Sequence, residues 1–240
     1  PFASVYGQFP GEGGNSMDKA LVSLVAANVA FVGSHFAMSH PLRAPMVKAL
    51  QEKGFSVVYT LISLATFYWV YVAYTAAPAG DLGGSGQAGW IVATALALPA
   101  MVLLAGSFAG NPAMPTPAAA AQARAAPKGV FKVTRHPMMW AFGLWALSHV
   151  VLWSSLRSVI TALAMGVLAL VGAHLQDRKK RAQLGDAWES WESHTSYWPR
   201  WASLPSVGLL WWALGAGLWL ALSWAHMPLG GIPAGIWRWF

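Results

Sequence analysis

Histidine is the residue type in this sequence that could carry out chemistry within apolar surroundings. Of the seven histidines, His35 and His149 lie furthest inside long apolar runs, and the chain has no cysteine. An ionisable side chain in lipid is costly unless it is paired or binds a metal. Neutral imidazoles bind haem iron, copper or zinc, whereas a hard divalent cation would require carboxylates. We therefore predict that His35 and His149 are metal ligands.

The residues around these two histidines suit a flat macrocycle. Trp145 and Trp153 stand four residues before and after His149, where they could enclose the edge of a porphyrin. Around His35, small residues would let a ring approach the backbone: Ala26, Ala30, Gly33 and Ala37. Two alternatives remain open. Small residues also serve helix packing in membranes, and a buried histidine can simply donate to a carbonyl.

Depth in the membrane keeps other histidines under consideration. At ~1.5 Å per residue, His35 lies roughly 6 Å to one side of the middle of its span, and His149 roughly 3 Å to the opposite side. Helix tilt could close this gap. His40 and His136 therefore remain alternative ligands or supporting residues. Arg135 and His136 precede a proline at a helix start, where the same motif could instead anchor the helix at the headgroups.

The composition predicts an all-α integral membrane protein. The 240 residues are 56% hydrophobic and 10% charged, whereas soluble domains are about 25% charged. Apolar runs of about 20 residues can cross a bilayer as helices. We predict six such spans, at residues 20–40, 55–77, 88–108, 137–154, 156–175 and 205–226. Residues 1–16 are expected to lie outside the fold, and residues 17–240 to form a single transmembrane domain.

The basic residues predict the orientation of the chain. Twelve of the fifteen lysines and arginines fall in the loops after spans one, three and five. Because positively charged loops stay on the cytoplasmic side, these loops are expected to be cytoplasmic in a multi-pass protein of a bacterial inner membrane. The net charge of +7 is accounted for in this way, so membrane lipid rather than nucleic acid is the expected partner.

Two segments resemble the NnrU family. The first is Gly129-Val-Phe-Lys-Val-Thr-Arg-His-Pro-Met-Met-Trp-Ala-Phe-Gly-Leu-Trp-Ala-Leu-Ser-His149, and the second is Val32-Gly-Ser-His-Phe-Ala-Met-Ser-His-Pro-Leu-Arg43. The resemblance is supported by Asp177-Arg-Lys-Lys and by Leu184-Gly-Asp, and it covers essentially residues 17–226. It implies a membrane protein associated with nitrite and nitric oxide reduction in denitrifying bacteria.

The family is similar to 15-cis-zeta-carotene isomerase, a membrane enzyme that carries haem b between histidines. That similarity implies haem b as the cofactor, with its ligands at His35 and His149, and a hydrophobic polyene or quinone-like substrate. The isomerase has a cysteine three residues before its second ligand, where this chain has Ala146. The likeness therefore supports haem binding, in redox-linked isomerisation or in electron transfer, more strongly than it supports isomerase activity.

Two other functions remain as alternatives. The Arg-His-Pro motif also resembles, more distantly, the isoprenylcysteine and phospholipid methyltransferases of membranes, and the bundle is expected to be similar to theirs. These enzymes use a Glu-Glu pair to bind S-adenosylmethionine, but here the corresponding segment reads Gln176-Asp-Arg-Lys-Lys-Arg181. The second alternative is a non-catalytic accessory or assembly subunit of a larger membrane complex.

Overall fold

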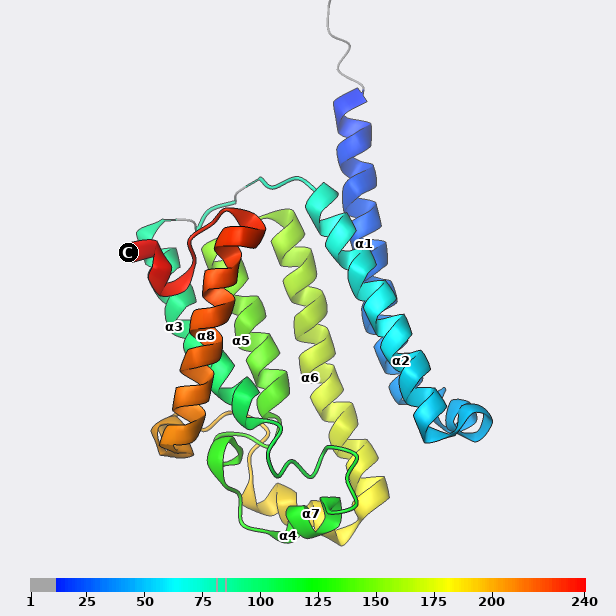
Figure 1. The fold of residues 1–240 in the computed structure, drawn as a ribbon. Coiled ribbons are helices and arrows are strands. Elements are labelled where there is room, and N and C mark those ends of the chain that lie inside the picture. The colour runs from blue at the N-terminus through cyan, green and yellow to red at the C-terminus, as the bar shows by residue number, and fades with distance from the viewer. Residues whose placement is uncertain (1–11, 81, 85) are drawn as a thin grey trace, which may run out of the picture. The chain divides into compact units, whose positions relative to one another are not determined.

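The computed structural model describes residues 12–80, 82–84 and 86–240, and its regular elements are all helical within these residues (Figure 1). In chain order they are α1 (Glu12–Ser39), α2 (Arg43–Ala76), α3 (Gln87–Gly106), α4 (Ala119–Arg124), η1 (Gly129–Lys132), α5 (Pro137–Leu152), α6 (Leu156–Leu184), α7 (Asp186–His194), η2 (Trp201–Val207), α8 (Leu209–Gly230) and η3 (Gly235–Trp239). Helix α1 starts five residues before the expected domain boundary at residue 17, and residues 1–11 lie outside the described part of the chain.

The expected multi-span all-α membrane fold is confirmed, with one difference in the spans. Five described helices are long and apolar enough to cross a bilayer: α1 from Lys19, α2, α3, α6 and α8. The remaining expected span, residues 137–154, corresponds to α5, which is apolar but has only 16 residues. At ~1.5 Å per residue it measures roughly 24 Å, against roughly 30 Å for the hydrocarbon core of a bilayer.

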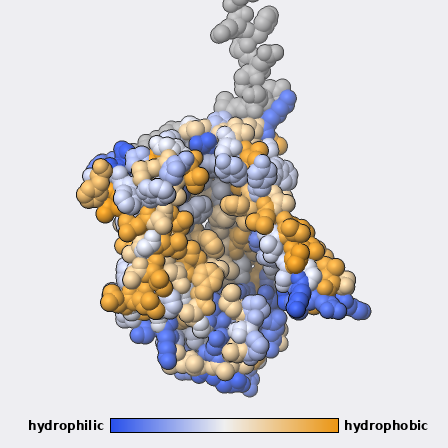
Figure 2. Space-filling model, in the orientation of Figure 1, coloured by the Kyte–Doolittle hydropathy of each residue, from blue (hydrophilic) through white to orange (hydrophobic). Residues whose placement is uncertain are grey.

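Large apolar side chains are exposed on the faces of these helices, as expected where lipid is the solvent. On α2, Leu61, Leu64 and Tyr71 are each about three-fifths exposed, at 60–61%. Hydroxyl groups within the helix donate to its own carbonyls, for example from Thr66 Oγ1 to Ile62 O at 2.8 Å. Hydrophilic residues gather at the lower end of Figure 2, where Figure 1 places α4 and α7.

Two compact units divide the chain. The first consists of the described part of Pro1–Gly80 with Ser155–Ala164, and the second of Asp81–Ser154 with Met165–Phe240. In the first unit, α1 and α2 pack against each other as an antiparallel hairpin (Figure 1). The start of α6 is held to this hairpin by Arg157, whose guanidinium stacks on the Tyr74 ring at 4.7 Å and donates to Ala77 O at 3.2 Å.

The segment between the first two spans is helical rather than the loop expected there. Helix α2 starts at Arg43 and is interrupted at Gln51, which has φ 60°. A positive φ outside glycine is uncommon and marks a sharp change of direction. The break separates a short helix with two basic residues from the apolar span, and an exposed ion pair of 3.0 Å between Arg43 and Glu52 bridges it. The basic residues between two apolar runs had favoured a loop. Helix propensity, which favours a helix here, is by itself only a weak guide.

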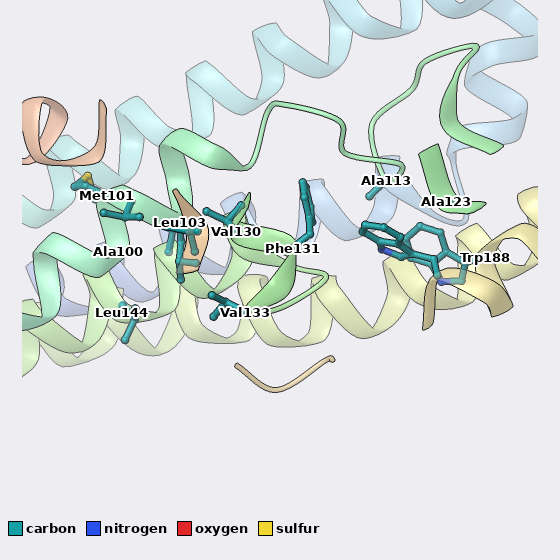
Figure 3. Close-up of a cluster of buried hydrophobic side chains, with 14 of the residues drawn as sticks. Ala100, Met101, Leu103, Ala113, Ala123, Val130, Phe131, Val133, Leu144 and Trp188 are labelled. Atoms are coloured by element: carbon teal, nitrogen blue, oxygen red, sulfur yellow. The ribbon is translucent and has the colours of Figure 1, made fainter. Parts of the chain in front are cut away.

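Helix α3 lies at the centre of the second unit and packs against both α5 and α8. Figure 3 shows Ala100, Met101 and Leu103 of α3 close to Leu144 of α5 and to Val130, within one buried apolar cluster. The cluster extends to Trp188 of α7, which is fully buried. Apolar packing thus joins the membrane helices of this unit to the polar segment that follows α6.

A glycine allows the close approach of α8 to α3. A Cβ atom at Gly215 would stand 2.5 Å from Val102 Cα, whereas one at Gly217 would meet nothing within 4 Å. Tight contacts at small residues are a main source of helix association in lipid.

We expect Gly215→Ala to lower the free energy of unfolding by about 1–3 kcal/mol, the usual cost of overpacking. Gly217→Ala is the matched control on the same helix, and we expect it to be neutral or slightly stabilising, since alanine favours helix. Circular dichroism during SDS titration of the detergent-solubilised protein measures both. Equal effects of the two substitutions would show that the α3–α8 contact is not tightly packed.

Candidate functional site

His149 lies three residues before the end of α5, half-buried, with its imidazole orientation set by the helix backbone. Its Nδ1 is 2.8 Å from Trp145 O. Because a carbonyl only accepts, Nδ1 must carry the proton, so Nε2 has its lone pair available for a metal. This arrangement, in which a backbone carbonyl orients a histidine, is usual for metal ligands.

The aromatic residues expected around His149 lie on both sides of it in the sequence, but they contact it differently. The Trp145 ring packs against the imidazole, with centroids 4.4 Å apart and planes inclined by 45°. Trp153 is the residue that ends α5, and its backbone N–H donates to His149 O at 2.9 Å. Trp145 therefore supports the imidazole itself, and Trp153 is the C-terminal cap of the helix that presents it.

A second imidazole faces His149 from α8. The rings of His149 and His226 have centroids 6.2 Å apart and are inclined by only 32°. His226 Nδ1 is 2.8 Å from Leu222 O, so it is oriented in the same way as His149. Within the described residues no group of three or more histidines, aspartates or glutamates could hold a metal ion. A haem needs only one or two protein ligands, so a histidine pair is sufficient for it.

His35 and His40 belong to the first unit. His35 Nδ1 is 2.7 Å from Phe31 O, and its Nε2 is 3.4 Å from Ser63 Oγ of α2. The imidazole also packs against the rings of Phe31 and Tyr59, at 4.4 and 5.5 Å. Both ring nitrogens of His35 thus have partners inside the α1–α2 hairpin. His40 is half-buried in the turn that follows α1.

Arg135 and His136 take part in a buried polar network at the other end of α5. Arg135 Nε and Nη2 donate to both oxygens of Asp177, near the end of α6, at distances from 2.7 to 3.2 Å. The side chains of Arg135 and Asp177 are only 11% and 4% exposed. Glu192 of α7 lies 3.5 Å from Arg135 and accepts two bonds of 2.7 Å from Arg181. The network therefore connects three helices of the second unit.

His136 is buried within this network rather than placed at a lipid headgroup. Its Nε2 lies 3.0 Å from Asp177 Oδ1, at ion-pair distance but without the angle of a hydrogen bond. Its Nδ1 lies 3.3 Å from Gln176 Oε1. Since an oxygen stands next to each ring nitrogen, neither nitrogen has a free approach for a metal. Asp177 and Gln176 thus hold the His136 imidazole in place at the start of α5.

The segment after α7 closes the network on its remaining side. Tyr197 packs edge-on to His136 at 5.3 Å and donates from its hydroxyl to Leu170 O at 2.7 Å. Partial burial and the nearby charge of Asp177 raise the pKa of Tyr197, so that its hydroxyl stays protonated and remains a donor. Thr134 Oγ1 donates to Tyr197 O at 2.9 Å and fixes this segment against the chain just before α5.

Sequence reasoning singled out Arg135 but not its partners. Asp177 lies 42 residues further on in a segment rich in charged residues, so its pairing could not be distinguished from exposure to solvent. His226 was noted only as the end of a span. One signal was available: His149 and His226 both lie toward the ends of expected spans that run in the same direction.

These features define a class of protein: an all-helical, multi-span membrane protein with histidines on its apolar helices and a buried ion network at the end of its bundle. The chain belongs to the NnrU family. The family's model, described as NnrU protein, matches residues 23–234. No curated protein and no solved structure matches the chain.

We expect Asp177→Asn to lower the free energy of unfolding by about 3–5 kcal/mol, because it keeps the shape of the side chain but leaves Arg135 buried with an incomplete counter-charge. Glu52→Gln, which removes the same charge from the exposed pair with Arg43, is expected to cost at most about 1 kcal/mol. Thermal unfolding in detergent compares the two variants. If they are equally stable, Asp177 does not act as a buried counter-ion.

Proposed function

We propose that this chain is a b-type haem protein of the bacterial inner membrane that acts in electron transfer, with His149 as a haem ligand. The observation that carries the proposal is the imidazole of His149. Its Nδ1 is bound to Trp145 O, its Nε2 is available, and it lies on an apolar helix beside an aromatic ring. This is the arrangement that an axial histidine requires.

The chemistry of the available donors supports haem over a bare metal ion. Apart from Ser148, the residues around His149 on α5 are apolar or aromatic, His226 of α8 faces it, and the chain has no cysteine. Zinc or copper would take three or four ligands from the protein, whereas a porphyrin brings four nitrogens of its own. The apolar porphyrin also suits a lipid-facing helix, since Phe142, one turn further from His149 than Trp145, is 43% exposed.

Electron transfer is favoured over isomerisation by a single residue. The related isomerase has a cysteine three residues before its ligand, and this chain has the buried Ala146 there. Without that thiol, no exchange between sulfur and imidazole ligands can occur at this position. A quinone-like molecule is the electron partner that fits the apolar surroundings, and the association with denitrification follows from the family.

A methyltransferase function receives less support from the polar network. Asp177 and Glu192, which lie close to the Arg-His-Pro segment, already neutralise Arg135 and Arg181. A carboxylate engaged in this way is not available to bind S-adenosylmethionine. An accessory role in a larger membrane complex differs from the proposal in its partners rather than its cofactor, because such a subunit can also carry haem.

We expect protein purified in detergent from haem-sufficient cells to show a Soret band and sharp α and β bands on reduction. His149→Ala should lower the haem content at least about tenfold, because even the loss of a residue that only orients a ligand can cost this much. His174→Ala, at an exposed position on α6, is the control and should retain its haem. A colourless, well-folded wild-type protein that takes up no added haemin would overturn the proposal.

A further inference from the structure

We infer that His226 of α8 is the second axial ligand of the haem at His149. The inference rests on the proposed function, since it concerns the same cofactor. His226 lies four residues before the end of the last long helix. The structure alone brings it opposite His149.

The separation of the two rings is the one that bis-histidine ligation requires. With metal–nitrogen bonds of ~2 Å, and ring centroids ~1 Å beyond the nitrogens, the centroids of two opposed imidazoles lie roughly 6 Å apart. The centroids of His149 and His226 are 6.2 Å apart. The spacing of the two rings therefore matches that of two imidazoles bound to one iron.

Both imidazoles are oriented in the same way before any metal binds. In each, Nδ1 is 2.8 Å from the carbonyl oxygen four residues earlier, at Trp145 for His149 and at Leu222 for His226. Each carbonyl fixes the proton on Nδ1 and leaves Nε2 unprotonated. Two histidines held in the tautomer that binds iron, facing each other from separate helices, form a prearranged pair of ligands.

The arrangement of the helices leaves the pair accessible to a flat group. Helices α5 and α8 run in the same direction in Figure 1, so the two histidines lie at corresponding ends. Both helices pack closely on α3, but within the described residues they make only sparse contact with each other. His226 is exposed, so a porphyrin dissolved in lipid could approach the pair from the side of α8.

The other histidines on apolar helices are less suitable as the second ligand. The Nε2 atom of His35 faces Ser63, and oxygen atoms stand next to both ring nitrogens of His136. His194 offers an informative comparison, because its Nδ1 is 2.7 Å from Ser190 O in the same local geometry. It lies on the polar helix α7, and among the described residues its ring contacts no other imidazole. His194 is therefore a matched control: its imidazole is oriented by a backbone carbonyl, as in His226, but it is not paired with a second imidazole.

The test uses the spin state of the bound iron, measured by electron paramagnetic resonance and absorption spectroscopy on the full chain in detergent. The wild type should contain low-spin iron with two histidine ligands. His226→Ala should keep haem on His149 but convert it to high-spin, and added imidazole should restore the low-spin spectrum. His226→Met should remain low-spin with a higher reduction potential, as expected for a His/Met pair. His35→Ala and His194→Ala should match the wild type.

Several results separate this inference from the proposed function. A low-spin spectrum unchanged in His226→Ala, or its loss in His35→Ala, would overturn His226 as the ligand while leaving haem binding intact. If His226→Ala loses its haem altogether, low-spin iron in His226→Met supports the inference, and a monodisperse His226→Met protein without haem contradicts it. If the wild type binds no haem at all, both proposals fail.

Discussion

The buried ion pair between Arg135 and Asp177 is the interaction on which the arrangement of the second unit depends. Apolar helices in lipid can slide or rotate against one another at little cost, since lipid is as apolar as their side chains. A charged pair that is 11% and 4% exposed does not permit this, because separating it would leave a buried charge without a partner. Through Glu192 the pair also fixes α7, and in this way it sets where α5 begins and which way it faces.

The sequence predicted those parts of the fold that depend on composition. Long apolar runs, almost free of charge, must be helical in lipid, and five of the six expected spans are such helices. It did not predict the helix between Arg43 and Gln51, because the basic residues there indicated a loop between two spans. It placed α5 to within two residues, at 137–154, but did not predict the packing of this helix on α3.

Within the candidate site, sequence reasoning identified single residues better than pairs. His149 was singled out because a histidine deep in an apolar run is costly to bury, and the structure places its ring against Trp145. Its role as a ligand stays a prediction. His226 was not singled out because a histidine at the end of a span can be solvated, so its presence there carries little free-energy cost. Arg135 and Asp177 show the same limit, since the pairing of residues 42 positions apart depends on the course of α6 and α7.

The two ends of α5 differ in chemistry: its start lies in a charged network, and its end carries His149 among apolar residues. At one end the ion network fixes the start of the helix at His136. His149 lies thirteen residues further on, roughly 20 Å along the axis at ~1.5 Å per residue. Helix α3 then holds α8 at the distance that Gly215 allows, which brings His226 opposite. An iron held by both imidazoles would have no open position for a substrate. Such a site suits the passage of electrons close to one face of the membrane better than it suits the binding and isomerisation of a polyene.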